Sequence, residues 1–294
     1  MFSLFEEQLL RDAERLVELE EQFADITPEA ISFFPEVPRA EADAVTNYLR
    51  LVEKGAQAID VPLIASLNGA SRGGWVHSAR SLQDAGAAAL ELNIYYVPGD
   101  LTLGGEEVEQ RHLDILRAVK SEVSIPVAVK LSPYFSSVGA MCQRLDRAGA
   151  DGLVLFNRFL QPDIDLDRLE VVSGVTLSSP VDARLPRTWI AVLRDHVEAS
   201  LAASSGVDQP GDVVKHLLAG ADVVCTTSAL VHHGVEHATR LVEGLESWLD
   251  GRRLTLDQAR GMLAVPGRTP ADAYERAGYV AALEKAKTTY GSLS

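Results

Sequence analysis

The chain is poor in cysteine, in aromatic residues and in positive charge. Its two cysteines, Cys142 and Cys225, have a spacing that fits neither a disulfide scaffold nor a zinc motif. It has 27 lysine and arginine residues against 42 aspartate and glutamate residues, a formal net charge of −15. This charge argues against a surface for nucleic acid or anionic membranes. Neighbouring histidines such as His232 and His233 diverge on a helix or strand, so we expect no metal site.

The sequence also lacks a long apolar run and a secretory signal. No stretch matches the roughly 20 apolar residues of a helix that spans a bilayer. Met1 does not open a signal peptide, so we expect a cytoplasmic protein. Hydrophobic residues make up 47% of the chain, which is enough for one large core. Because no linker composition interrupts the chain, we predict a single domain over residues 1–294, with a helical tail from about residue 237 to residue 294.

One sequence pattern recurs along the chain. It appears as DAGAAALELN (84–93), RAGADGLVLFN (147–157) and LAGADVVCTT (218–227). In each, a helical pattern ends at a glycine, which adopts the left-handed conformation of a helix C-terminus without steric cost. A short apolar run without alternation follows, which is typical of a strand buried on both faces. Helix, glycine and buried strand, repeated, indicate an α/β protein with a parallel sheet.

Scanning for this unit predicts the positions of the strands. Six are expected, at Leu63–Leu67, Ala89–Asn93, Val127–Leu131, Gly152–Phe156, Leu201–Ser204 and Val223–Thr227. The chain opens with a helical pattern over residues 2–23, and Phe2–Leu4 is a candidate for the stub of one more strand. The segment 169–178 alternates between turn residues and predicts a small hairpin.

Polar residues stand at the C-terminal end of nearly every predicted strand. A (β/α)8 barrel of about 250 residues and a doubly wound sheet both fit the repeat. No G-x-G-x-x-G follows a strand, and a barrel places its active site at the C-terminal ends of its strands. A single asparagine there would be explained by a strand-end cap. For six successive strands we favour a barrel and an active site that includes Asn68, Asn93, Lys130, Ser132, Asn157, Ser204, Ser205 and Thr226–Ser228.

Two of these strand ends have further chemical features. SSGVDQPGDVVKHL (204–217) and CTTSAL (225–230) combine small and hydroxyl residues with new helix starts, which suit a phosphate group. A plain αβ turn is the alternative. Lys130 ends an apolar strand, where its charge is costly without a negative partner. It would pair with a carboxylate, form a Schiff base or face an electron-rich cofactor.

An ordered set of short motifs resembles a known family. The set is ELN (91–93) with VPG (97–99), VKLSPYF (129–135), the strand ending at Asn157, SSGV (204–207) and TTSAL (226–230). It is similar to the dihydroorotate dehydrogenase family, most closely its soluble class 1 branch, over about residues 3–263. The resemblance implies an FMN-linked oxidoreductase with a TIM barrel. The first strand of the family barrel, its first helix and most of its second strand have no counterpart, so we expect an N-terminally short version.

The resemblance also implies roles for individual residues. Lys130 would lie beside the flavin and stabilise its reduced, anionic form. The FMN phosphate would bind the turn of Ser204, Ser205 and Gly206 together with Thr227 and Ser228. Asn68, Asn93 and Asn157 would hold an amide-rich pyrimidine, since an amide side chain both donates and accepts hydrogen bonds; Asn93 would also approach the flavin.

The chain departs from the family at the residue that handles the proton. Tyr95 and Tyr96 stand where the family has a cysteine or serine base, and a tyrosine titrates near 10. We expect them to donate a proton or to stack on the substrate ring. The resemblance implies oxidation of dihydroorotate or a related small molecule, in pyrimidine biosynthesis, with an unknown electron acceptor and a homodimeric assembly. The alternatives are a barrel without flavin that serves as a binding subunit, and a lyase that forms a Schiff base at Lys130.

Overall fold

The structure is a computed structural model, and it describes residues 3–5, 44–68, 72–96, 99–158, 162–172, 174, 176–268 and 271–290. The chain divides into two compact units. The first unit comprises Met1–Ser136 and Arg144–Gly152, and the second comprises Ser137–Gln143 and Leu153–Ser294. The single domain that we predicted over the whole chain stays a prediction.

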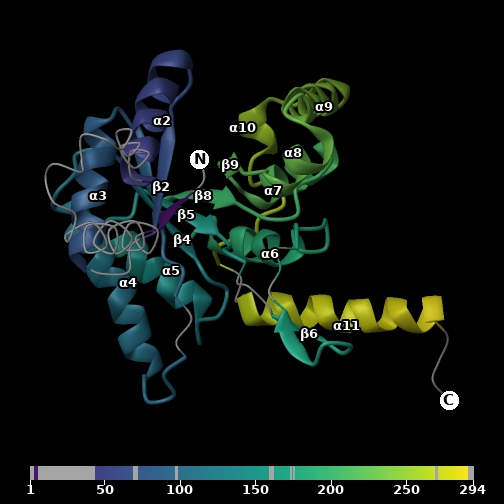
Figure 1. The fold of residues 1–294 in the computed structure, drawn as a ribbon. Coiled ribbons are helices and arrows are strands. Elements are labelled where there is room, and N and C mark those ends of the chain that lie inside the picture. The colour runs from purple at the N-terminus through teal and green to yellow at the C-terminus, as the bar shows by residue number, and fades with distance from the viewer. Residues whose placement is uncertain are drawn as a thin grey trace, which may run out of the picture. The chain divides into compact units, whose positions relative to one another are not determined.

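The first unit is a parallel sheet with connecting helices. Its strands β1 (Ser3–Phe5), β2 (Ile64–Asn68), β3 (Ala89–Asn93) and β4 (Val127–Leu131) pair in that order. Helices α2 (Ala44–Ala58), α3 (Arg72–Asp84) and α4 (Gly105–Lys120) lie between them in the chain, and α5 (Val138–Arg147) follows β4. Figure 1 shows α3 and α4 packed side by side next to these strands. Strands that follow one another in the chain are therefore neighbours in the sheet.

The two faces of this sheet differ in chemistry. Leu90 and Leu92 of β3 and Val127 and Val129 of β4 are completely buried. They alternate with Glu91 and Asn93 in β3 and with Ala128 and Lys130 in β4, and successive side chains of a strand point to opposite faces. One face is therefore a dry apolar layer, and the other face carries the residues that matter for the site.

The second unit has the same construction. Strands β5 (Gly152–Leu155), β8 (Ser200–Ala203) and β9 (Val223–Val224) are adjacent in that order, with β8 and β9 parallel. Its helices are α6 (Arg184–Leu193), α7 (Pro210–Ala219), α8 (Ser228–His233), α9 (His237–Arg252), α10 (Leu256–Ala259) and α11 (Ala271–Tyr290). Figure 1 shows α7, α8 and α9 close together in this unit. The last three helices lie in the segment that was predicted as a helical tail.

Glycines end the helices of the repeated sequence pattern, as the sequence predicted. Gly86, Gly149 and Gly220 have φ values of +97°, +96° and +117°. At Gly220 the backbone N–H reaches the carbonyls of His216 and Leu217, which pairs two groups that a helix end otherwise leaves unsatisfied. The glycine is thus the local reason why each helix stops and a buried strand can begin.

Two expectations for smaller elements had different outcomes. The strand stub near the N-terminus exists as β1, which pairs with Ser66–Asn68 of β2. The hairpin predicted at 169–178 is wrong in position, because it is formed by β6 (Asp163–Asp165) and β7 (Glu170–Val172). Leu169 lies in the turn with a φ of +51°, so the alternating run begins in a turn instead of a strand. The rest of the helical segment predicted up to residue 23 lies outside the described residues.

The α/β class with a parallel sheet is confirmed. Within each unit the strand order follows the chain order, which is the arrangement of a β/α barrel and not that of a doubly wound sheet. Among the residues that the structure describes, no helix is both long and apolar enough to cross a membrane.

A buried histidine predicts how the stability of the second unit depends on pH. His216 is fully buried, and burial, with a smaller effect of the Arg187 charge, lowers its pKa from 6.5 to about 4. Asp212 opposes this shift and Lys215 adds to it. The unfolded chain binds the proton more tightly, so the stabilisation is complete above about pH 6.5 and is lost as the pH falls towards 4.

The unfolding free energy of the wild type should fall as the pH is lowered from about 7 to 4. In His216→Leu this fall should be smaller by roughly 3 kcal/mol, because the variant has no histidine to protonate at this position. Urea unfolding at both pH values measures this difference. The exposed His196 is the matched control, and His196→Ala should behave like the wild type. Equal acid losses in wild type and His216→Leu would show that this histidine does not drive the pH dependence.

Candidate functional site

The first unit brings three of the predicted site residues to one edge of its sheet. Asn68 and Asn93 are the last residues of β2 and β3, and both are buried, with 5% and 7% exposed. Lys130 lies directly opposite Asn93 in the register of β3 and β4. Leu67 pairs with Leu92, so the two asparagines follow on adjacent strands. Two amides and one ammonium group therefore stand at the C-terminal ends of neighbouring strands, as predicted.

A half-buried carboxylate that the sequence analysis missed, Glu91, lies on the same face. Glu91 Oε1 accepts a hydrogen bond from Ser66 Oγ at 2.8 Å and lies 3.7 Å from Lys130 Nζ. The side chains of Glu91 and Lys130 are only 17% and 22% exposed. The ion pair gives Lys130 the negative partner that its position requires. Glu91 stands two residues before Asn93, so the alternation of the strand was the signal that would have found it.

Tyr48 of α2 holds Ser66 through the backbone. Its hydroxyl donates to the Ser66 carbonyl at 2.9 Å and accepts from the Ser66 N–H at 3.2 Å. Burial raises the pKa of this phenol; the hydrogen bond with Ser66 opposes the shift, and the Glu91 charge adds to it. The phenol thus stays protonated and ties α2 to the strand that carries Ser66 and Asn68.

Removing this hydroxyl should weaken the first unit. We expect Tyr48→Phe to lower the unfolding free energy by about 1–2 kcal/mol, because it withdraws a hydrogen-bond partner from two Ser66 backbone groups. Tyr279→Phe, at an exposed position of α11, is the control and should change little. Chemical denaturation of the three proteins measures the effect, and a Tyr48→Phe variant as stable as the control would contradict it.

The two tyrosines after β3 are half-buried. The Tyr95 N–H donates to the Asn93 carbonyl at 2.9 Å, which turns the chain immediately after the strand. The Arg111 guanidinium of α4 stacks over the Tyr96 ring, 4.6 Å from its centroid. A cation at this distance from an aromatic face is attractive, so α4 helps to orient Tyr96. The role of either tyrosine in proton transfer stays a prediction.

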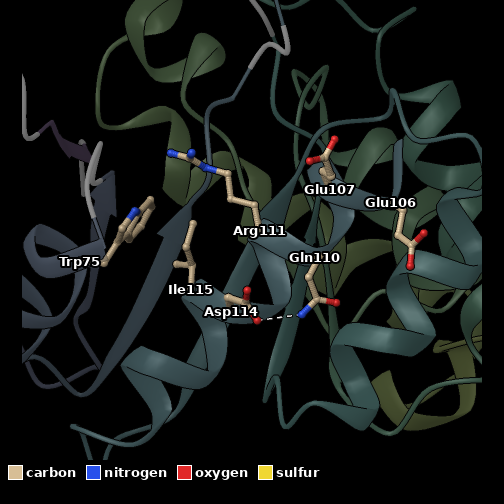
Figure 2. Close-up of a pocket in the computed structure, with 7 residues that line it drawn as sticks. All are labelled: Trp75, Glu106, Glu107, Gln110, Arg111, Asp114 and Ile115. Carbon is tan, nitrogen blue, oxygen red and sulfur yellow. Dashed lines mark hydrogen bonds between the residues drawn. The ribbon is translucent and has the colours of Figure 1, made fainter. Parts of the chain in front are cut away.

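A cavity lies between α3 and α4 in the same unit. Its volume is about 570 Å³, and it is lined by Trp75, Glu106, Glu107, Gln110, Arg111, Asp114 and Ile115. Figure 2 shows Trp75 on one side, Arg111 and Ile115 between, and the two glutamates on the other side. Gln110 Nε2 donates to Asp114 Oδ1 at 2.7 Å. None of the described lining residues is a predicted site residue, and Arg111 connects the cavity to Tyr96.

The second unit places the predicted phosphate turn after β8. Ser204 N–H donates to the Leu155 carbonyl at 2.7 Å, and Ser205 and Gly206 have φ values of +83° and +70°. A Cβ atom at Gly206 would lie 2.5 Å from the Ala183 nitrogen and from the Ser179 oxygen. Only glycine fits this close approach of two backbones. Left-handed serine is uncommon, and such strain is often found at functional sites.

The turn after β8 is connected to the loop after β9. Thr226 Oγ1 donates to the Val207 carbonyl at 2.9 Å, and Thr227 is the residue before α8. Ser228 Oγ accepts from the Ser178 N–H at 3.0 Å and contacts Ser178 Oγ at 2.8 Å. Ser178 was not predicted, because its contact spans 50 residues of sequence. Asn157, buried, follows β5 in this unit.

Comparison with protein families identifies the chain. The family model described as "Dihydroorotate dehydrogenase" matches residues 37–249. This chain belongs to the dihydroorotate dehydrogenase family. The match confirms the family named from the sequence motifs and its α/β barrel fold class. The dihydroorotate dehydrogenase match ends inside α9, so α10 and α11 lie outside it.

Individual relatives of this dihydroorotate dehydrogenase family member carry names of two types. A "Putative dihydroorotate dehydrogenase A (fumarate)" of Aeropyrum pernix is 30% identical over 71% of this chain and 70% of the relative. A "Dihydroorotate dehydrogenase B (NAD(+)), catalytic subunit" of Listeria welshimeri is 33% identical over 57% of each chain. The protein of the same name from Halalkalibacterium halodurans is 32% identical over 58% of each chain. The chain thus spans less than two thirds of these B-type relatives.

Proposed function

We propose that the protein is an FMN-dependent oxidoreductase that oxidises dihydroorotate or a related dihydropyrimidine, a step of pyrimidine biosynthesis. The observation that carries the proposal is Lys130, which lies opposite the buried Asn93 on the neighbouring strand in a chain of this family. Amides pair with ring C=O and N–H groups, and a cation suits a site where negative charge develops.

The residues present fit FMN in their chemistry. Ser205 and Gly206 both have positive φ values, and turns of this kind can direct successive backbone N–H groups towards one anion such as a phosphate. Thr227 and Ser228 would add hydroxyl groups for the phosphate, and Lys130 and Asn93 would bind the ring. When bound, FMN supplies the acceptor for the hydride that leaves the substrate. The chain's own side chains bind the ring, orient the substrate and neutralise charge.

The large cavity between α3 and α4 suits the substrate poorly. Dihydroorotate carries a carboxylate, whereas the described lining of this cavity has three carboxylates, Glu106, Glu107 and Asp114, and one cation, Arg111. Like charges at such short range disfavour an anionic ligand. We therefore assign the substrate to the strand ends of Asn68, Asn93 and Lys130.

The Schiff-base lyase is the weaker alternative. A Schiff base forms when a neutral Lys130 amine attacks the substrate carbonyl and water leaves, whereas in the structure Lys130 Nζ forms an ion pair with Glu91 at 3.7 Å. Borohydride trapping with a carbonyl substrate tests this chemistry directly. A barrel that binds no flavin is the other alternative.

The visible absorbance spectrum of the purified protein tests the proposal. We expect a flavin spectrum, release of FMN on denaturation, and bleaching of the flavin by dihydroorotate without oxygen. Absence of flavin, even after addition of FMN, would overturn the proposal that FMN is the cofactor. Bound flavin that dihydroorotate does not bleach would overturn the proposal that dihydroorotate is the substrate. Fumarate and NAD⁺, which the names of the relatives mention, are the first acceptors to test for reoxidation.

Assembly and location remain open to direct tests. We expect a homodimer by analogy with the family, and light scattering of the purified protein measures its mass. The cytoplasmic location also stays a prediction, which fractionation of the producing cells would test.

A further inference from the structure

A second, smaller cavity lies in the second unit, against the outer sides of α6 and α7. Its volume is about 280 Å³. Arg187 and Thr188 of α6 and Lys215 of α7 supply its polar groups. Apolar side chains of both helices, together with residues 263–265, form the rest of the wall. Leu263 is 64% exposed, so an apolar side chain stands at the opening. Two cations beside an apolar wall are notable in a chain with a net charge of −15.

Among the described residues, one nitrogen of the Arg187 guanidinium has no acceptor. Its Nε atom is buried and has no hydrogen-bond partner. Within the part of the chain that the structure describes, no carboxylate forms an ion pair with Arg187. Burial is the main reason that the pKa of Arg187 is lowered, which reports the cost of a poorly solvated charge. A buried donor without a partner costs about 1–3 kcal/mol, and more for a charged group.

The nearest candidate partner is already in use. Asp212, which attracts Arg187 over a longer distance, accepts hydrogen bonds from the Gln209 N–H at 3.0 Å and the Asp208 N–H at 3.3 Å. It also accepts one from Lys215 Nζ at 3.3 Å. These bonds hold the start of α7, so Asp212 cannot turn to Arg187 without releasing the helix N-terminus. No acceptor in the described part of the chain pairs with Arg187 Nε, and a ligand in the cavity would supply the acceptor that it lacks there.

We infer that this cavity binds a small amphiphilic monoanion, a carboxylate with a short hydrocarbon or aryl group. The carboxylate would pair with the planar guanidinium of Arg187, whose donors match its two oxygens. The apolar part would cover Val192 and Leu218 and reach Leu263. A volume near the lower limit of ligand pockets restricts the ligand to a few carbon atoms beyond the carboxylate. The overall negative charge of the protein disfavours ligands with several charges. The inference does not depend on the proposed redox function.

Binding of several carboxylates and of one uncharged analogue to the full chain tests the inference. Hexanoate, octanoate and benzoate are titrated into the protein by calorimetry, and hexanol is titrated as the uncharged analogue of hexanoate. We expect at least one carboxylate to bind, and hexanol to bind about tenfold more weakly than hexanoate or not at all. Equal affinity for hexanol and hexanoate, or no binding of any carboxylate, would overturn the inference.

Two variants locate the bound carboxylate. Arg187→Gln should weaken binding about tenfold to a hundredfold, because it removes the charged donor. Arg184→Gln is the matched control, since Arg184 is exposed on the same helix and does not line the cavity, and it should bind like the wild type. Val192→Phe keeps Arg187 and fills the cavity, so it should abolish binding even if Arg187→Gln is unstable. Unchanged affinity in Val192→Phe, or in folded Arg187→Gln, would show that the ligand binds elsewhere.

Discussion

Lys130→Ala is expected to slow the reduction of bound FMN by dihydroorotate about 10²- to 10³-fold, the usual loss when one preorganised charged donor is removed. The variant deletes the ammonium group at the strand ends and leaves the rest of the sheet in place. Stopped-flow measurement without oxygen follows the bleaching of the flavin. Lys120→Ala removes a lysine that pairs instead with Asp151 at 2.7 Å, and it should keep the wild-type rate.

The carboxylate beside Lys130 gives this test a second arm. Glu91→Gln keeps the size of the side chain and an acceptor for Ser66 Oγ, but it removes the charge that holds Lys130 Nζ. We expect a smaller loss of rate than in Lys130→Ala, because the lysine is less well positioned but still present. A Lys130→Ala variant that reduces FMN at the wild-type rate would show that Lys130 does not face the reacting groups. The alternative of a barrel without redox activity would show no bleaching in any of these proteins.

Gly206→Ala is expected to lower the unfolding free energy by about 2–3 kcal/mol and to reduce the affinity for FMN. Its added methyl group would lie 2.5 Å from two backbone atoms of the segment that precedes α6, at a φ of +70° that alanine rarely adopts. The turn must therefore move away from Ser179 and Ala183, or change its own conformation. Chemical denaturation measures the stability, and a fluorescence titration with FMN measures the affinity.

Gly211→Ala is the matched control for this turn. Gly211 lies near the start of α7, and a Cβ there would meet nothing within 4 Å. Its replacement should leave stability unchanged or raise it slightly, because alanine restricts the unfolded chain more than glycine does. FMN affinity that falls equally in both variants would show that the turn at residue 206 has no special role in phosphate binding.

The fold was largely predictable because its signals are local. Each buried strand is an apolar run, and each preceding helix ends at a glycine with positive φ, so adjacent residues suffice to locate them. The hairpin was misplaced because Leu169 and Val171 are exposed, and their alternation therefore reflects no burial. When neither face of a strand is buried, the alternation of apolar and polar residues does not show where the strand begins or ends.

The sequence by itself determined the α/β class, the family and the presence of Asn68, Asn93 and Lys130 at strand ends, since these depend on position along the chain. Only the tertiary structure decided how these residues are supported. The Ser66–Glu91–Lys130 contacts depend on the register of three strands, and the bond from Tyr48 to Ser66 depends on how α2 packs. The unpartnered Nε of Arg187 is visible only in the structure, where Asp212 is bound by the backbone at the start of α7. Hydrogen bonds and ion pairs act over a few ångströms in space, and residues far apart in the chain meet at that range only after folding.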